Sequence, residues 1–176
     1  KVLAALKEET GQLYKGVMYG GFMVTKNGIK LIEYNARFGD PEAMNILPLL
    51  ETDFAEICKD IANGTLSSSK VRFAKKATVC KYIVPEGYPE KAKLGKIELP
   101  ETAAKTYYAS VEQKEGGLYT KGSRAVAFVG IADSIEEAER VAEDACSRVK
   151  GDVYHRSDIG TKELIEKRIS HMKTLR

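Results

Sequence analysis

Residue types that bind metal ions and phosphate groups are concentrated in one short stretch near the start of the chain. Glu33, Asn35 and Arg37 occupy alternate positions there, directly after the turn pair Asn27–Gly28. Side chains of a β-strand alternate between its two faces, so a strand would place these three on one face. Carboxylate and amide oxygens about 6–7 Å apart along a strand can reach one hard cation such as Mg²⁺. An arginine on the same face is suited to bidentate binding of phosphate or carboxylate.

The residues that follow predict a helix start beside these groups. Asp40 is a favourable N-cap, and Pro41 is favourable at the first helical position. Glu42 would lie in the first turn, where a carboxylate is stabilised by the helix dipole. Because helix N-termini present free N–H groups to anions, this arrangement favours a site that handles phosphate.

Glu33 and Asn35 also have a simple structural explanation, since an exposed strand can carry both on its solvent face. Ile29 and Leu31 occupy the same alternate positions and are expected to face inward. Polar groups that continue an apolar face would line a cleft. We therefore favour a metal site at Glu33 and Asn35.

Composition excludes several classes of function. The chain has 176 residues, 43% of them hydrophobic and 30% charged, with a formal net charge of +3. This charge is too small to indicate nucleic-acid binding, and no apolar run approaches the ~20 residues of a membrane span. Three well-separated cysteines, Cys58, Cys80 and Cys146, are typical of reduced buried thiols. We expect a cytoplasmic protein with no nucleic-acid or membrane partner.

The order of the predicted elements indicates an α+β protein in two pieces. In the first, a helix over 1–10 precedes strands over 15–25 and 29–36, and Asp53 and Asn63–Gly64 bound a later helix. In the second, strands are followed by C-terminal helices. The expected second-piece elements are strands over 72–84, 96–99, 105–113, 118–120 and 124–131, and helices over 134–149 and 161–172. Residues 64–70 are the best candidate linker between the pieces. We place domain boundaries at 1–66 and 70–176.

The motif Glu33–x–Asn35–x–Arg37–Phe–Gly–Asp40–Pro41–Glu42 closely resembles the signature of the glycinamide ribonucleotide synthetases, or phosphoribosylamine–glycine ligases. These are ATP-grasp enzymes of de novo purine biosynthesis. The Glu-x-Asn-x-Arg core occurs in other ATP-grasp enzymes, whereas Arg-Phe-Gly-Asp-Pro-Glu is the specific part. Segments 15–20, 47–53, 125–130 and 154–160 also resemble this family, so the resemblance covers essentially the whole chain.

The resemblance implies a fold, a reaction and a set of residue roles. The fold is the C-terminal half of an ATP-grasp domain followed by a small β-rich C-terminal domain with helices. Glu33 and Asn35 would bind Mg²⁺ or Mn²⁺, Arg37 would act on the transferring phosphoryl group, and Asp40, Pro41 and Glu42 would bind substrate. The reaction joins glycine to 5-phosphoribosylamine through glycyl phosphate, with ATP as co-substrate giving ADP and phosphate.

Two features qualify this expectation. Related sites often carry another acid or amide on the preceding strand, where this chain has Gly20 and Gly21, so the ligand of a second metal ion stays open. The first residues read as the tail of a helix already in progress. We therefore expect the C-terminal part of a longer enzyme, inactive by itself, whose partner is the N-terminal half of the same enzyme.

Two other hypotheses remain. The chain could belong to a different ATP-grasp carboxylate–amine ligase, which a comparison of glycine with formate or bicarbonate would reveal. It could also be a catalytically inert fragment or docking module that only binds a partner.

Overall fold

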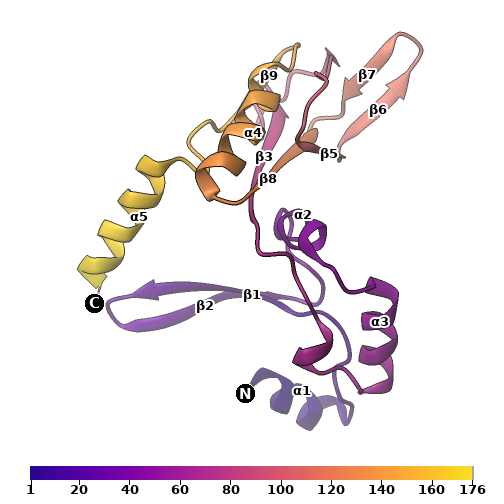
Figure 1. The fold of residues 1–176 in the computed structure, drawn as a ribbon, viewed down its shortest axis with the longest axis vertical. Coiled ribbons are helices and arrows are strands. Elements are labelled where there is room, and N and C mark those ends of the chain that lie inside the picture. Colours follow the sequence, from indigo (N-terminus) through magenta and orange to yellow (C-terminus); the bar gives the residue numbers. More distant parts are fainter. Residues whose placement is uncertain (176) are drawn as a thin grey trace. The chain divides into compact units, whose positions relative to one another are not determined.

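The computed structural model describes residues 1–175, which form helices and antiparallel sheets (Figure 1). The α+β class expected from the sequence is confirmed. Two compact units divide the chain. The first comprises Lys1–Ala43 and Leu47–Ala74, and the second comprises Met44–Ile46 and Lys75–Arg176.

The first unit consists of short helices and one hairpin. Its elements are α1 (Val2–Thr10), β1 (Tyr19–Thr25), β2 (Gly28–Asn35), the start of α2 (Glu42–Ile46), α3 (Phe54–Asn63) and the 3-10 turns Leu47–Leu49 and Ser68–Lys70. Asp53 caps α3 as expected, accepting hydrogen bonds from the amides of Ala55 and Glu56 at 2.7 and 3.1 Å. Gly64 ends the helix at φ 71°, a left-handed conformation that costs glycine little.

A β-bulge shapes the hairpin of β1 and β2. The tight turn leads into Gly28 at φ 89°, and Thr25 pairs with Gly28, Val24 with Ile29 and so on in strict order. The register then shifts, because Gly21 pairs with Glu33 and Phe22 with Leu31, so Ile32 is the extra residue. Beyond the bulge, each residue of β1 therefore pairs with a β2 residue one position further along than an unbroken register would give.

The entry into α2 differs from the expected cap. α2 begins at Glu42 with Pro41 in the N-cap position, and no side chain caps it. Asp40 is thus not the N-cap and Pro41 is not the first helical residue. The first turn is closed by the backbone instead, since the Ala43 amide donates to the Gly39 carbonyl at 2.9 Å.

The second unit is built on two antiparallel sheets. One has the strand order β5-β8-β3-β9 and the other β4-β7-β6. The strands are β3 (Ala77–Pro85), β4 (Lys96–Ile97), β5 (Lys105–Tyr108), β6 (Val111–Lys114), β7 (Gly117–Thr120), β8 (Val126–Ala132) and β9 (Val153–His155), and the helices are α4 (Ile135–Ser147) and α5 (Lys162–Leu175).

Packing of α4 on β3 and β8 forms the core of this unit (Figure 1). Phe128, Ile83 and Val126 are fully buried. At Gly130 the helix approaches the strand so closely that a Cβ would lie 1.8 Å from the carbonyl oxygen of Ala138. Glycine is therefore required for this contact between sheet and helix.

Two elements differ from the sequence prediction in this unit. The strand expected over 105–113 is split, because β5 pairs with β8 whereas β6 pairs with β7 in the other sheet. The chain turns between them, where the Val111 amide donates to the Ala109 carbonyl at 3.1 Å. β9 was not predicted, since three residues are too few to show a period; it is ordered by pairing with Ile83, Val84 and Pro85 of β3.

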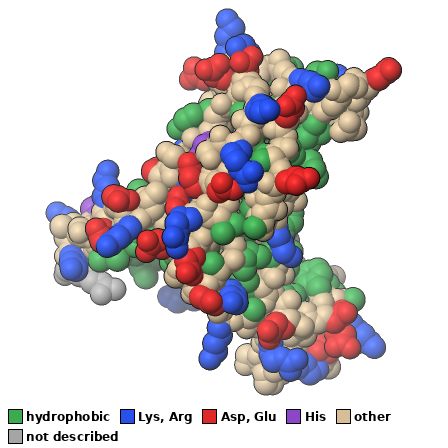
Figure 2. All heavy atoms as spheres, turned by 45° about the horizontal axis from the view of Figure 1, so that its top comes forward, with side chains coloured by type: hydrophobic (Ala, Val, Ile, Leu, Met, Phe, Trp, Pro, Cys, Tyr) green, Lys and Arg blue, Asp and Glu red, His purple; other side chains and the backbone are tan. Residues whose placement is uncertain are grey.

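Within residues 1–175, no helix is both long and apolar enough to cross a bilayer. Acidic and basic side chains are interspersed on the face seen in Figure 2.

Candidate functional site

Glu33 and Asn35 come together at the end of β2. The Asn35 side-chain nitrogen donates a hydrogen bond to Glu33 Oε1 at 2.9 Å. The two residues before and after Tyr34 therefore lie on one face, as strand periodicity requires. This bond uses the nitrogen of the Asn35 amide. The amide oxygen, which is the atom that a hard cation prefers, takes no part in the bond to Glu33.

Tyr19 joins this pair to Glu42. It is the cross-strand partner of Asn35, and its hydroxyl donates to Glu42 Oε1 at 3.0 Å. The pKa of the Tyr19 phenol is raised, first by the hydrogen bond to Glu42 and then by the charge of Glu42, by burial and by the charge of Glu33. The Glu42 carboxylate thus faces the phenol directly. We call Tyr19, Glu33, Asn35 and Glu42 the hairpin cluster.

Gly39 allows Glu42 to take its place in the hairpin cluster. Gly39 is buried, and a Cβ on it would overlap the Glu42 carboxylate, with the nearest atom Oε2, and would lie 3.3 Å from the Tyr19 ring. Any larger residue would displace the carboxylate. The glycine of the Arg-Phe-Gly-Asp-Pro-Glu motif therefore has a steric reason at this position.

Arg37 does not continue the strand face. β2 ends at Asn35, and Arg37 lies in the bend that follows. Its side chain is exposed, and Nη1 donates to the carbonyl oxygen of Phe38 at 2.7 Å. The expectation that Arg37 shares a strand face with Glu33 and Asn35 is wrong, because the chain leaves the extended conformation before reaching it.

The apolar residues that favoured a cleft are not buried. Ile29 is 70% exposed and Leu31 is 52% exposed, so the expectation that they face inward is wrong for this chain. The bulge at Ile32 also interrupts the alternation that would have joined them to Glu33 and Asn35. The case for a metal site therefore depends on the hairpin cluster itself.

The donor set of the hairpin cluster fits a hard cation only in part. One carboxylate and one amide oxygen are suitable ligands, but Mg²⁺ takes six, several of them from water or substrate phosphates. Within the described residues, no group of three or more His, Cys, Asp or Glu side chains is placed to hold a metal ion. The cluster therefore suits a cation that is shared with a phosphate-bearing ligand rather than enclosed by protein.

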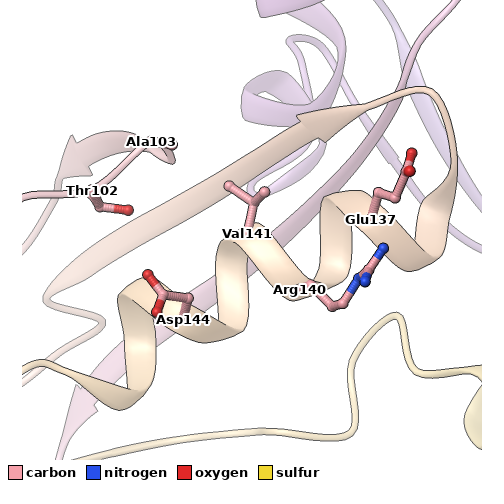
Figure 3. Close-up of a pocket in the computed structure, with 6 residues that line it drawn as sticks. All are labelled: Thr102, Ala103, Glu137, Arg140, Val141 and Asp144. Atoms are coloured by element: carbon pink, nitrogen blue, oxygen red, sulfur yellow. The ribbon is translucent and has the colours of Figure 1, made fainter.

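A pocket of about 480 Å³ lies elsewhere, in the second unit. Figure 3 shows Glu137, Arg140 and Asp144 projecting from successive turns of α4, with Thr102 on the other side. None of the predicted site residues lines it. The pocket is open and carries both acidic and basic side chains, and this arrangement does not match the predicted metal and phosphate site.

A second cluster of charged groups is buried in the same unit. Lys81 is 1% exposed and donates to Glu139 at 2.6 Å, to Glu143 at 2.5 Å and to the carbonyl oxygen of Ser157 at 2.8 Å. His155 Nε2 lies 3.0 Å from the other oxygen of Glu143. We call these residues the lysine cluster. All three protons of the Lys81 ammonium have acceptors, which is the pattern of a structural group.

Sequence reasoning places Tyr19 within the strand expected over 15–25 and gives it no functional role. An unbroken two-residue hairpin pairing Thr25 with Gly28 would place Tyr19 opposite Tyr34 rather than Asn35. The one-residue bulge shifts the register, so that Tyr19 pairs with Asn35. The only available signals were the glycines Gly20 and Gly21 beside it, since glycine in a strand often accompanies a bulge.

Comparison with known proteins gives the same family for both units. Residues 1–43 match the model "Phosphoribosylglycinamide synthetase, ATP-grasp (A) domain", and residues 78–162 match "Phosphoribosylglycinamide synthetase, C domain". The phosphoribosylamine–glycine ligases of Methanocaldococcus jannaschii and Methanosarcina acetivorans are 58% and 53% identical to the chain over 182 and 176 residues. These matches take in 100% and 99% of the chain.

A crystal structure of the phosphoribosylamine–glycine ligase of Thermotoga maritima superposes with a TM-score of 0.72 at 30% identity, covering 86% of this chain and 38% of that one. The chain spans 41% and 40% of the length of the two archaeal relatives. Fold, motif and relatives agree on the ATP-grasp class of protein. The chain belongs to the phosphoribosylglycinamide synthetase family.

Proposed function

We propose that the protein forms part of a cytoplasmic ligase that joins glycine to 5-phosphoribosylamine, using ATP, in de novo purine biosynthesis. The observation that carries this proposal is the hairpin cluster within the family motif. Asn35 is hydrogen-bonded to Glu33, and Tyr19, which pairs with Asn35 across the hairpin, is hydrogen-bonded to Glu42. The relatives that bear the ligase name match the chain from end to end.

The hairpin cluster would hold the divalent cation that ATP-grasp ligases use. Glu33 and Asn35 would contribute oxygens to a Mg²⁺ or Mn²⁺ ion that binds together with ATP. When bound, such a cation offsets the negative charge that phosphoryl transfer gathers. Asn35 is fixed by its bond to Glu33, so this pair would be preorganised for the cation.

Arg37 would stabilise charge on the transferring group. An oxygen of the glycine carboxylate attacks the γ-phosphorus, ADP leaves, and glycyl phosphate forms. The amine nitrogen of phosphoribosylamine then attacks the carbonyl carbon and gives up one proton, the bond from that carbon to the phosphate-bearing oxygen breaks, and phosphate leaves with this oxygen. The Arg37 guanidinium donates to the neighbouring carbonyl of Phe38, a contact that it can exchange for an anionic phosphate oxygen.

Asp40, Pro41 and Glu42 would line the substrate side of the turn. Asp40 is exposed and Glu42 half-buried, and the two flank Pro41 at the start of α2.

We propose that residues 1–66 complete the ATP-grasp domain and that 70–176 form the C-terminal domain. The remaining part of the ATP-grasp enzyme would be the partner that completes the active site.

A chimera tests this function. The chain replaces its matching segment in the M. jannaschii ligase, and ligation of labelled glycine is measured with ATP, Mg²⁺ and phosphoribosylamine. We expect product from the chimera and none from the 176-residue chain alone. A folded chimera without ligation activity would overturn the proposal, and a comparison with formate as the acid would identify a related ligase instead.

A further inference from the structure

Tyr19 fixes the position of the Glu42 carboxylate. Its hydroxyl donates to Glu42 Oε1 at 3.0 Å. On the other side, Oε2 occupies the space over Gly39 where a Cβ would stand. A glutamate at the start of the five-residue helix α2 would otherwise sample several rotamers. Held by a phenol and seated over a glycine, Glu42 keeps one orientation.

The same tyrosine is tied to the metal-binding pair. Tyr19 stands opposite Asn35 in the register of the hairpin, and Asn35 is hydrogen-bonded to Glu33 at 2.9 Å. Tyr19 therefore sets the position of Glu42 relative to the strand that carries Glu33 and Asn35. A ligand with a carboxylate at one end and an ammonium at the other could have its two ends placed by these two groups.

Charge decides which substrate group meets Glu42. A carboxylate attracts cationic donors and repels the phosphates of ATP and the carboxylate of glycine. The amine of phosphoribosylamine must keep its lone pair available for attack. The ammonium of glycine is the cationic donor among the reacting groups, and its bond to a carboxylate is charge-assisted.

We propose that Tyr19 is a positioning residue, which orients Glu42 to accept the ammonium group of glycine while the hairpin holds the carboxylate end near the metal pair. This inference rests on the proposed function. It assigns Tyr19 and the turn at Gly39–Glu42 a role in binding glycine.

The Tyr19→Phe variant of the chimera tests the role, since it keeps the ring beside Gly39 and removes only the hydroxyl. We expect the KM for glycine to rise about tenfold, as for loss of a hydrogen bond to a charged group. The KM for ATP should stay within about twofold and kcat within about threefold, because the phosphoryl-transfer groups are untouched. Tyr34→Phe is the matched control. Its ring packs edge-to-face on Phe22, and its loss of a hydroxyl should leave both KM values unchanged.

A double-mutant cycle separates positioning from general destabilisation. If Tyr19 acts through Glu42, Tyr19→Phe should have no further effect on the KM for glycine in a Glu42→Ala background. An unchanged KM in the single variant, or equal increases for glycine and ATP, would overturn the inference. Loss of ligation in the unmodified chimera would instead overturn the proposed function, so the two failures are distinguishable.

Discussion

The hairpin cluster and the lysine cluster both gather charged side chains, but they differ in how completely those charges are balanced. In the lysine cluster one buried ammonium faces the carboxylates of Glu139 and Glu143 together with a backbone carbonyl. In the hairpin cluster Glu33 and Glu42 face a tyrosine and an amide. No cation of the cluster itself offsets their charge.

The surroundings differ in the same way. The lysine cluster lies under α4 beside a packed core, whereas Ile57 is the one buried hydrophobic side chain of the first unit among residues 1–175. A buried group whose charges balance makes a favourable or near-zero net contribution to stability. A group with excess negative charge can instead attract a cationic ligand. We therefore expect mutations in the two clusters to have opposite consequences.

The largest effect should come from Glu33→Ala in the chimera. Removal of the carboxylate should lower kcat by on the order of a thousandfold, as for loss of a group that stabilises transition-state charge. The urea midpoint of the 176-residue chain should hardly move, since Glu33 is exposed. Glu115→Ala, an exposed carboxylate in the turn between β6 and β7, is the control. Ligation near the unmodified rate would exclude Glu33 from the site.

Lys81→Met should do the reverse. It leaves Glu139 and Glu143 without their cation and should cost about 3 kcal/mol of unfolding free energy, measured by urea denaturation. Neutralising both partners as well, with Glu139→Gln and Glu143→Gln, should restore most of the loss. Lys76→Ala, which breaks an exposed ion pair with Asp133, should cost under about 1 kcal/mol. Equal losses for the two lysines would refute the distinction between buried and exposed pairs.

Gly130→Ala tests the packing that encloses the lysine cluster. The new methyl group would collide with the backbone of α4 at Ala138, so we expect a loss of about 1–3 kcal/mol in the same urea assay. Gly95→Ala, where a Cβ meets nothing within 4 Å, should change stability little. A neutral Gly130→Ala would mean that α4 can move away without cost.

The pH dependence of stability should follow the lysine cluster at both extremes. Burial opposes ionisation of Glu143, yet its bonds to Lys81 and His155 lower its pKa below the ordinary 4.5. Its contribution is therefore complete above pH 4.5 and is lost as pH falls through the lowered value. Burial likewise acts to lower the pKa of Lys81, but Glu139 and Glu143 raise it above 10.5, so this contribution is complete below pH 10.5 and is lost as pH rises through the raised value.

Urea unfolding of the chain between pH 3 and 11 would measure this dependence, with Glu143→Gln as the comparison. We expect the variant to lose part of the acid-side slope. An identical slope in both proteins would show that Glu143 does not contribute.

The sequence predicted local features well wherever a single side chain or turn determines them. Asp53 and Gly64 bound α3 as expected, and Ser134 accepts from the Glu137 amide at 3.2 Å at the start of α4. The pairing of Glu33 with Asn35 followed from strand periodicity alone. The family motif predicted the family, which the comparisons confirm, because its combination of polar residues is specific.

Features that depend on register or on distant partners could not be predicted. Tyr19 meets Asn35 only because Ile32 bulges, and nothing in a period of two specifies where a bulge occurs. Lys81 reads as an ordinary polar residue within β3, since its partners Glu139 and Glu143 lie 58 and 62 residues away. Arg37 left the expected face because the strand ended two residues before it.

The most direct test of the central claim follows oxygen from glycine to phosphate. The chimera is supplied with glycine labelled with ¹⁸O in its carboxylate, together with ATP, Mg²⁺ and phosphoribosylamine, and the phosphate is analysed by mass spectrometry. If the hairpin cluster supports formation of glycyl phosphate, each phosphate released should carry one ¹⁸O, and Glu33→Ala should release almost none. Unlabelled phosphate, or labelled phosphate formed at an undiminished rate by Glu33→Ala, would contradict the account.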